Sequence, residues 1–215
     1  MSTGALGNVV TCGATYTEIL PVHECFRSIQ GEGHYQGKAA FFIRLAGCDV
    51  GCHWCDVKES WTVDASGYWS VQYLAEQAAA SGAQIAVITG GEPLLYDLTF
   101  LTAQLKSRGL KTHLETSGSS PLSGEWDWIC LSPKKFKPPL PTIFTQANEL
   151  KMIIFNKSDF LWAEENAAKV TVSCKRFLQP EWSREKKMLA EIVHYIKDHP
   201  QWELSLQIHK YLGLP

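Results

Sequence analysis

Three cysteines lie within eight consecutive residues of the chain. Cys48, Cys52 and Cys55 follow the spacing C-x3-C-x2-C in the stretch GCDVGCHWCDVKESW. A disulfide uses two cysteines, and a structural zinc ion usually takes four protein ligands, so a group of three fits neither directly. Thiolates also bind iron–sulfur clusters. The spacing therefore predicts a metal centre in this loop.

A 4Fe–4S cluster matches three thiolates well. Each of its four irons takes one outside ligand, so three cysteines leave one iron open, as catalytic metals usually are. A zinc ion remains an alternative if Cys25, His23 or His53 supplies the fourth ligand. No second cysteine pair at the spacing of a zinc ribbon is present in the sequence, which favours the cluster.

The composition sets limits on the class of protein. The chain has 215 residues, a net charge of −2 and a hydrophobic fraction of 45%, which indicate one soluble domain without a basic surface for nucleic acid. No apolar run of about 18 residues and no secretory leader is found, so we expect neither a membrane span nor secretion. Unpaired, clustered cysteines favour the reducing cytoplasm. We expect a flexible N-terminal extension over residues 1–18 and a single catalytic domain over residues 19–215.

Strand-like runs alternate with helical patterns from residue 39 onward. Leucines recur at helical spacing over residues 97–109, with Gly109 as a C-cap, and a similar stripe covers 184–198. Strands are predicted over residues 39–47, 84–91, 110–118, 126–134, 149–155, 169–174 and 203–209. This alternation indicates βα units around a parallel sheet. About six units are too few for a closed eight-unit barrel, so we predict an α/β fold with a partial, open βα barrel.

Polar residues share one position in this pattern. The cysteines follow the first strand, TGGEP (89–93) the second, ETSG (115–118) the third and SPK (132–134) the fourth. A further polar stretch leaves the strand predicted over 169–174, and His209 ends the last one. Carboxyl ends of parallel strands gather on one face, where βα folds carry their active sites. The sequence therefore predicts one composite site.

The cysteine motif, with Trp54 just before its last cysteine, resembles that of the radical S-adenosylmethionine (SAM) superfamily. TGGEP matches a second element of that superfamily, a Gly-Gly-Glu-Pro turn one βα unit later. The resemblance implies a 4Fe–4S cluster whose open iron is chelated by SAM. It also implies reductive cleavage of SAM to a 5'-deoxyadenosyl radical, with electrons from a flavodoxin- or ferredoxin-type reductant.

The stretch SIQGEGHYQGKAAFFIRLAGC before the cluster and the C-terminal LQIHKYLGLP narrow the resemblance to the 7-carboxy-7-deazaguanine synthase family, from about residue 19 to the end. This family converts 6-carboxy-5,6,7,8-tetrahydropterin, with loss of ammonia, to a precursor of queuosine-type tRNA bases, and a homodimer is implied. Substrate contacts would fall on Ile29, Gln30, Gly31, Glu32, Arg44, Thr89, His209 and Pro215. SAM contacts would fall on Trp54, Asp56, Gly91, Glu92, Ser117, Ser132, Pro133, Lys134 and Gln179.

The chemistry of such a substrate accounts for several of these residues. Arg44 can form a bidentate pair with a carboxylate. Glu32, Gln30, His209 and the terminal carboxylate of Pro215 can serve the polar edge of a pterin, because unmatched buried polar groups cost about 1–3 kcal/mol each. These residue types therefore agree with the resemblance.

One position departs from the family pattern. The usual Cys-Asp-Thr or Cys-Asp-Ser supplies a hydroxyl that helps to hold Mg²⁺ against the substrate carboxylate, but this chain has Val57 there. Valine cannot bind a cation that requires oxygen ligands, so the need for Mg²⁺ is in doubt. We expect either weaker Mg²⁺ dependence than is usual in this family or a site completed by water or by Asp56. Two other functions stay open at this point: another small radical SAM enzyme, such as a glycyl-radical activase, and a non-catalytic zinc or iron–sulfur module.

Overall fold

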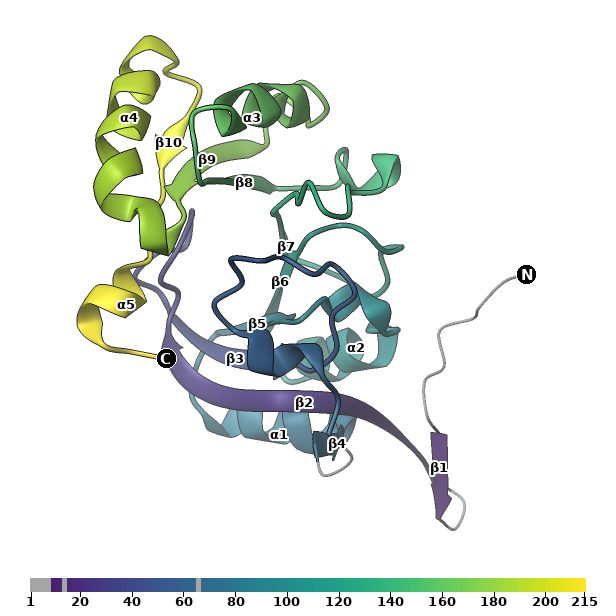
Figure 1. The fold of residues 1–215 in the computed structure, drawn as a ribbon. Coiled ribbons are helices and arrows are strands. Elements are labelled where there is room, and N and C mark those ends of the chain that lie inside the picture. The colour runs from purple at the N-terminus through teal and green to yellow at the C-terminus, as the bar shows by residue number, and fades with distance from the viewer. Residues whose placement is uncertain (1–8, 13–14, 65–66) are drawn as a thin grey trace.

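One open sheet organises the protein. The computed structural model describes residues 9–12, 15–64 and 67–215, and within them the strand order is β1-β2-β3-β5-β6-β7-β8-β9-β10, with β4 paired to β2 (Figure 1). Parallel pairing runs from β3 to β10, whereas β2 is antiparallel to its neighbours. The strands are β1 (Val9–Cys12), β2 (Thr15–Ile29), β3 (Ala39–Leu45), β4 (Tyr68–Ser70), β5 (Ile85–Gly90), β6 (Lys111–Thr116), β7 (Trp128–Leu131), β8 (Glu149–Ile154), β9 (Lys175–Pro180) and β10 (Glu203–Leu204). The predicted partial, open barrel is confirmed.

Helices cover the outer side of the curved sheet. The α-helices of the described residues are α1 (Val71–Ala80), α2 (Thr99–Ser107), α3 (Asp159–Ala167), α4 (Glu185–Asp198) and α5 (Ile208–Leu212), and short 3-10 helices are η1 (Lys58–Trp61), η3 (Pro93–Leu95), η4 (Pro141–Ile143) and η5 (Trp182–Arg184). In Figure 1, α1 to α4 surround the curve, while α5 and the C-terminus lie beside β2. None of the helices in the described residues is long and apolar enough to cross a bilayer.

Side chains alternate between the two faces of each strand, so the sheet has an outer and an inner layer of side chains. Ile43 on β3 and Ile88 on β5 point outward into the main core, against the helices. Phe42 and Val87 point inward and form a small apolar cluster with the partly buried Phe26 on β2. Because side chains alternate, residues two positions farther along the same strands also face the inside. This arrangement closes one end of the half-barrel with apolar side chains and leaves polar ones toward the other end.

Two strand predictions need correction. Residues 169–174 form turns rather than a strand, and the strand follows at β9; Val172 is 98% exposed, so its β-branched side chain has no layer to pack on. The strand predicted over 203–209 ends at Leu204. The chain then turns back over the inside of the sheet, where the Ile208 N–H donates to the carbonyl of Gly31 at 3.0 Å and α5 begins.

Only part of the N-terminal extension expected over residues 1–18 can be described. Val9–Cys12 pairs with the first residues of β2, from Thr15 to Glu18, as an antiparallel hairpin. Residues 1–8 and 13–14 lie outside the described residues. The long strand β2 had no counterpart among the predicted strands, because its residues lack a regular alternation of polar and apolar types.

Candidate functional site

A cavity of about 490 Å³ lies on the inside of the sheet, at the carboxyl ends of the parallel strands. The cysteine loop, the strand ends and the C-terminal segment all contribute to its wall. Most residues predicted from the sequence line it. They are Ile29, Gln30, Glu32, Arg44, Cys48, Cys52, Trp54, Cys55, Asp56, Val57, Thr89, Gly91, Glu92, Ser117, Ser132, Lys134, Gln179, His209 and Pro215. Gly31 and Pro133 are not among the lining residues, so the cavity brings together all but two of the predicted positions.

The cysteine loop presents its three thiols to this cavity. Backbone hydrogen bonds from Gly47 and Cys48 to the η1 turn fold the loop over, and the indole N–H of Trp61 donates to the Cys55 sulfur at 3.4 Å. N–H donors to sulfur are one means by which proteins tune iron–sulfur clusters. Three thiols on one cavity wall, with a donor to one sulfur, fit a cluster held at three corners.

The suggested fourth zinc ligands lie elsewhere. Cys25 packs against the outer core, on the opposite face of β2 from Glu24 and Phe26. His23 and His53 are exposed, and neither is a lining residue of the cavity. None of these three suggested ligands therefore lines the cavity that the cysteines share.

The TGGEP turn is pressed against the cysteine loop. The Gly91 N–H donates to the Leu45 carbonyl at 3.0 Å, and the Glu92 N–H donates to the Gly47 carbonyl at 2.9 Å. A Cβ at position 91 would overlap the carbonyl oxygen of Gly47. The second glycine is thus required by a close approach of two backbones, which joins two of the predicted motifs directly.

The carboxylate of Glu92 accepts all of its hydrogen bonds from donors of the protein itself. Its Oε1 accepts from the Leu94 N–H at 3.1 Å and from the Thr116 hydroxyl at 2.5 Å, and its Oε2 accepts from both the N–H and the hydroxyl of Ser117. The side chain is 1% exposed. Its four acceptor positions are occupied in this way, so Glu92 locks the TGGEP turn to the end of β6 and leaves little capacity to bind SAM itself.

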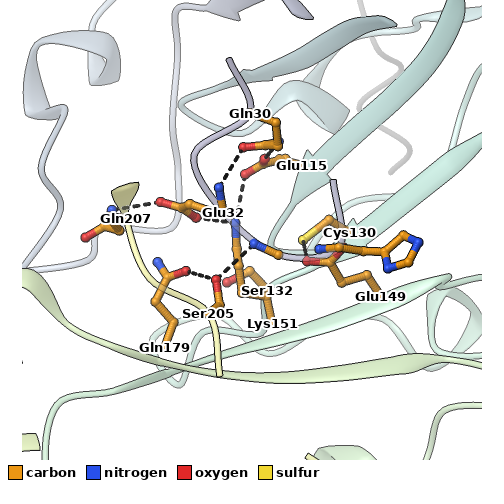
Figure 2. Close-up of polar contacts among 12 residues, drawn as sticks. Gln30, Glu32, Glu115, Cys130, Ser132, Glu149, Lys151, Gln179, Ser205 and Gln207 are labelled. Atoms are coloured by element: carbon orange, nitrogen blue, oxygen red, sulfur yellow. Dashed lines mark hydrogen bonds and ion pairs between the residues drawn. The ribbon is translucent and has the colours of Figure 1, made fainter. Parts of the chain in front are cut away.

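An ionic network forms one side of the cavity (Figure 2). The Lys151 ammonium lies 2.5 Å from Oε2 of Glu32 and 3.0 Å from Oε2 of Glu115. Gln207 donates to Glu32 at 2.8 Å, and Gln30 donates to Glu115 at 2.8 Å. Burial opposes ionisation of Glu32, but Lys151 and these hydrogen bonds outweigh it and lower its pKa to about 2. The network therefore keeps an ionised acceptor in the cavity wall.

Lys151 and Glu115 were not predicted from the sequence. Burial lowers the pKa of Lys151, yet the nearby carboxylates outweigh that effect and raise it well above its usual value. The sequence did contain a signal for Lys151, because side chains alternate between the two faces of a strand. In ELKMIIF (149–155), Leu150, Met152 and Ile154 belong to the outer core, so Lys151 between them must face inward.

The C-terminal segment brings His209 to the same wall. A Cβ at Gly31 would overlap the imidazole of His209, so this glycine, although it does not line the cavity, makes room for the ring. Burial lowers the pKa of His209, and the Glu32 carboxylate opposes that shift. The neutral ring therefore dominates near pH 7, and one of its nitrogens can accept a hydrogen bond.

Arg44 and the SPK loop complete the polar wall. The Arg44 Nε donates to Glu24 on the neighbouring strand at 2.8 Å, and its guanidinium lies 5.9 Å from the centre of the Phe26 ring. Lys134 donates to both oxygens of Ser132 at 2.6 Å and stands over the Trp54 ring. The side chains of Arg44 and Lys134 are thus each held by a partner within the wall.

A buried histidine below the network makes folding pH-dependent. Burial lowers the pKa of His113 from 6.5 to about 4, against the pull of Asp127 and Glu115. The folded protein binds this proton more weakly than the unfolded chain does. The contribution of neutral His113 to the free energy of unfolding is therefore complete above pH 6.5 and is lost as the pH falls toward 4. Between pH 7 and pH 5 we expect a loss of about 1–2 kcal/mol from this residue.

The pH effect is measured by urea unfolding of the anaerobic protein at both pH values. His113→Phe keeps a ring beside Tyr35 and should remove that part of the loss. His194→Phe, whose side chain is 79% exposed, should keep the wild-type dependence. Equal pH dependence of wild type and His113→Phe would show that His113 is not responsible.

Comparisons with known proteins agree with this geometry. A family model described as the radical SAM superfamily matches residues 42–131. The 7-carboxy-7-deazaguanine synthase of Flavobacterium psychrophilum is 52% identical over 198 residues, covering 92% of this chain and 94% of that protein. The synthase of the same name from Synechocystis is 48% identical and covers the whole of both chains.

A solved structure supports the same assignment. The crystal structure of QueE from Escherichia coli superposes with a TM-score of 0.80 at 30% identity, over 88% of this chain and 94% of that one. The radical SAM superfamily implies a 4Fe–4S cluster and SAM, and the three cysteines at the cavity fit them. By its identity to these relatives over nearly the full length, the chain belongs to the 7-carboxy-7-deazaguanine synthase family of the radical SAM superfamily.

Proposed function

We propose that this enzyme converts 6-carboxy-5,6,7,8-tetrahydropterin to 7-carboxy-7-deazaguanine with loss of ammonia, in the biosynthesis of queuosine-type 7-deazapurines. The observation that carries the proposal is one cavity that holds both the cysteine triad and the Glu32–Lys151–Glu115 network. The first can hold a radical-generating cofactor, and the second can hold a polar heterocycle. The family to which the chain belongs supplies the reaction.

The residues of the chain orient the substrate. Glu32 is held ionised, so it can accept hydrogen bonds from the amidine-like N–H groups of the pterin. Gln30 and His209 lie on the same wall and can pair with the remaining donors and the carbonyl. Arg44 supplies a cation for the carboxylate. Matching each buried polar group avoids about 1–3 kcal/mol per unmatched group.

A second set of residues binds SAM in this proposal. The set lies around the cysteine loop and comprises Trp54, Asp56, Gly91, Ser117, Ser132, Lys134 and Gln179. The cluster and SAM, when bound, supply homolytic hydrogen removal from the substrate. Ile29, Thr89 and Pro215 complete the substrate side. Gly31 and Pro133 do not line the cavity and contribute only through their neighbours. Glu92 contributes by fixing the TGGEP turn.

The proposed partners follow from the reaction. A radical SAM cluster needs an electron, which we assign to a flavodoxin- or ferredoxin-type protein in the cytoplasm. We further propose that the enzyme is a homodimer. We expect no nucleic-acid partner, because the net charge of −2 offers no excess of positive charge for a phosphate backbone.

The function is tested by anaerobic reconstitution of the cluster. The enzyme is incubated with SAM, dithionite and 6-carboxytetrahydropterin, and the product is identified by mass spectrometry. We expect 7-carboxy-7-deazaguanine with little net consumption of SAM. Formation of 5'-deoxyadenosine without the deazapurine would point instead to another radical SAM reaction, such as activation of a glycyl-radical protein.

We expect weaker Mg²⁺ dependence than is usual in this family. Val57 lines the cavity where a hydroxyl is usual, and its side chain offers no oxygen ligand. Chelator-treated enzyme should therefore keep most of its activity, and Val57→Thr should gain a response to added Mg²⁺. Rates are compared with and without Mg²⁺ after treatment with EDTA. A strict Mg²⁺ requirement of the wild type would contradict this expectation.

A further inference from the structure

Lys210 on α5 reaches the residues next to Val57. Its Nζ lies 2.6 Å from Oδ2 of Asp56, and the ammonium stands 5.1 Å from the centre of the Trp182 ring. The Lys210 side chain is 19% exposed and that of Asp56 is 53% exposed, so the pair lies at the open edge of the cavity. Asp56, Val57 and Lys210 all line the same cavity. A protein cation therefore stands beside the position where the family hydroxyl is missing.

The side chains at this position do not fit Mg²⁺. Mg²⁺ requires near-octahedral coordination by oxygen, and Val57 supplies no oxygen. Asp56 has carboxylate oxygens, but one of them accepts from the Lys210 ammonium. A divalent cation at Asp56 would have to displace that ammonium or lie close to it, which like charges disfavour.

The other cations of the wall have partners of their own. Lys151 lies between Glu32 and Glu115, whereas Arg44 is paired with Glu24 through its Nε and has further N–H groups for a ligand. Lys134 donates to Ser132. Lys210 has three N–H donors, of which the structure assigns one, to Asp56. Its remaining donors suit an anionic group of a ligand in the cavity.

The backbone around Lys210 is well fixed. Besides the bond between Ile208 and Gly31, the Leu214 N–H donates to the His209 carbonyl at 2.9 Å. Gln207 is held by Glu32, a residue of the substrate wall. Glu32 and Lys210 thus line the same cavity and are connected through the short segment that begins at Gln207.

We propose that the Lys210 ammonium takes the place of Mg²⁺ in this enzyme and binds the carboxylate of the substrate, beside Arg44. This inference rests on the proposed function, because it concerns the carboxylate of that substrate. It makes Lys210 a substrate-binding residue and explains how Val57 is compatible with activity. It also predicts that Lys210 and a metal ion compete at this position, so that Val57→Thr combined with removal of Lys210 should restore the Mg²⁺ response more strongly than Val57→Thr alone.

The experiment compares wild type, Lys210→Met, Lys210→Arg and the double variant Lys210→Met/Val57→Thr, each reconstituted anaerobically and treated with EDTA. The KM for 6-carboxytetrahydropterin is measured with and without Mg²⁺. Binding of Mn²⁺, as a probe for Mg²⁺, is measured separately by electron paramagnetic resonance in the presence of substrate and without reductant. Lys187→Met on the exposed side of α4 is the matched control.

We expect Lys210→Met to raise KM by roughly ten- to a hundredfold, as for a lost charge-assisted hydrogen bond. Lys210→Arg should keep a KM near that of the wild type. In the double variant, added Mg²⁺ should bring the KM back toward the wild-type value. The double variant should also bind Mn²⁺ at least about tenfold more tightly than the wild type, and structural damage would not produce such a gain.

Two results would overturn the inference while leaving the proposed function in place. One is an unchanged KM in Lys210→Met, and the other is Mn²⁺ binding by the wild type as tight as by the double variant. If the wild-type enzyme makes no deazapurine under any condition, the proposed function fails, and this inference fails with it.

Discussion

Replacing Lys151 with methionine is expected to lower the free energy of unfolding by about 3–5 kcal/mol and kcat/KM by at least about 100-fold. The Lys151 side chain is 5% exposed and lies between the carboxylates of Glu32 and Glu115. Without the ammonium, two carboxylates share a largely enclosed wall with no positive partner. Removing one member of a buried ionic group leaves the other charges uncompensated, which costs more than the group contributes when intact.

The pH profile separates a positioning role of Lys151 from simple loss of stability. With Lys151 present, the pKa of Glu32 is about 2. Without it, burial is unopposed by the ammonium and raises that pKa, so Glu32 is protonated over a wider pH range, and the protonated carboxyl is a weaker acceptor for the N–H groups of the pterin. The activity of Lys151→Met should then increase with pH as Glu32 ionises, whereas the wild type should show no such rise.

Lys175→Met is the matched control for this variant. Lys175 begins the neighbouring strand β9, and its side chain, 47% exposed, lies 4.0 Å from Glu203. Exposed ion pairs contribute about 0–1 kcal/mol, so the control should resemble the wild type. If Lys151→Met lost activity with an unchanged pH profile, Lys151 would act on stability alone and not on the charge of Glu32.

The parts of the fold that were predicted correctly are those whose evidence lies within one continuous stretch of the sequence. The cysteine loop and TGGEP are continuous motifs, and β3 and β5 are apolar runs that end at them. The first error concerns a β-branched stretch, residues 169–174, that had no surface to cover, and the second concerns residues 203–209, whose alternating apolar residues leave the sheet after Leu204. Residues 169–174 look like a strand, but only the sheet position occupied by β9 decides which residues pair with β8.

The ionic network could not be assembled from the sequence because its members are far apart along the chain. Glu32 and Lys151 are separated by 119 positions, and their contact depends on the curvature of the sheet. The period of β8 turns Lys151 inward, yet it does not say which carboxylates it meets. Sequence motifs thus located the cofactor side of the cavity, and the three-dimensional fold was needed for the ionic wall on the substrate side.

Glu92→Gln is expected to destabilise the SAM-free protein by about 2–5 kcal/mol and to weaken SAM binding at least about tenfold. Each carboxylate oxygen of Glu92 accepts two donors, from Leu94, Thr116 and Ser117. Glutamine has the same shape, but it places an NH2 group against two of those donors. Each buried donor left without an acceptor costs about 1–3 kcal/mol, and the TGGEP turn would loosen against the cysteine loop.

Thermal unfolding of the SAM-free protein decides how Glu92 acts. If Glu92 fixes the turn, as its full set of donors indicates, Glu92→Gln melts at a lower temperature before any SAM is added. If Glu92 were mainly a SAM ligand, the variant would keep its melting temperature and lose only the spectral change of the cluster on SAM binding. Glu125→Gln, at a side chain that is 76% exposed, should match the wild type in both measurements. A buried carboxylate that already holds four donors gains little from a further partner, so we expect stability and SAM binding to fall together.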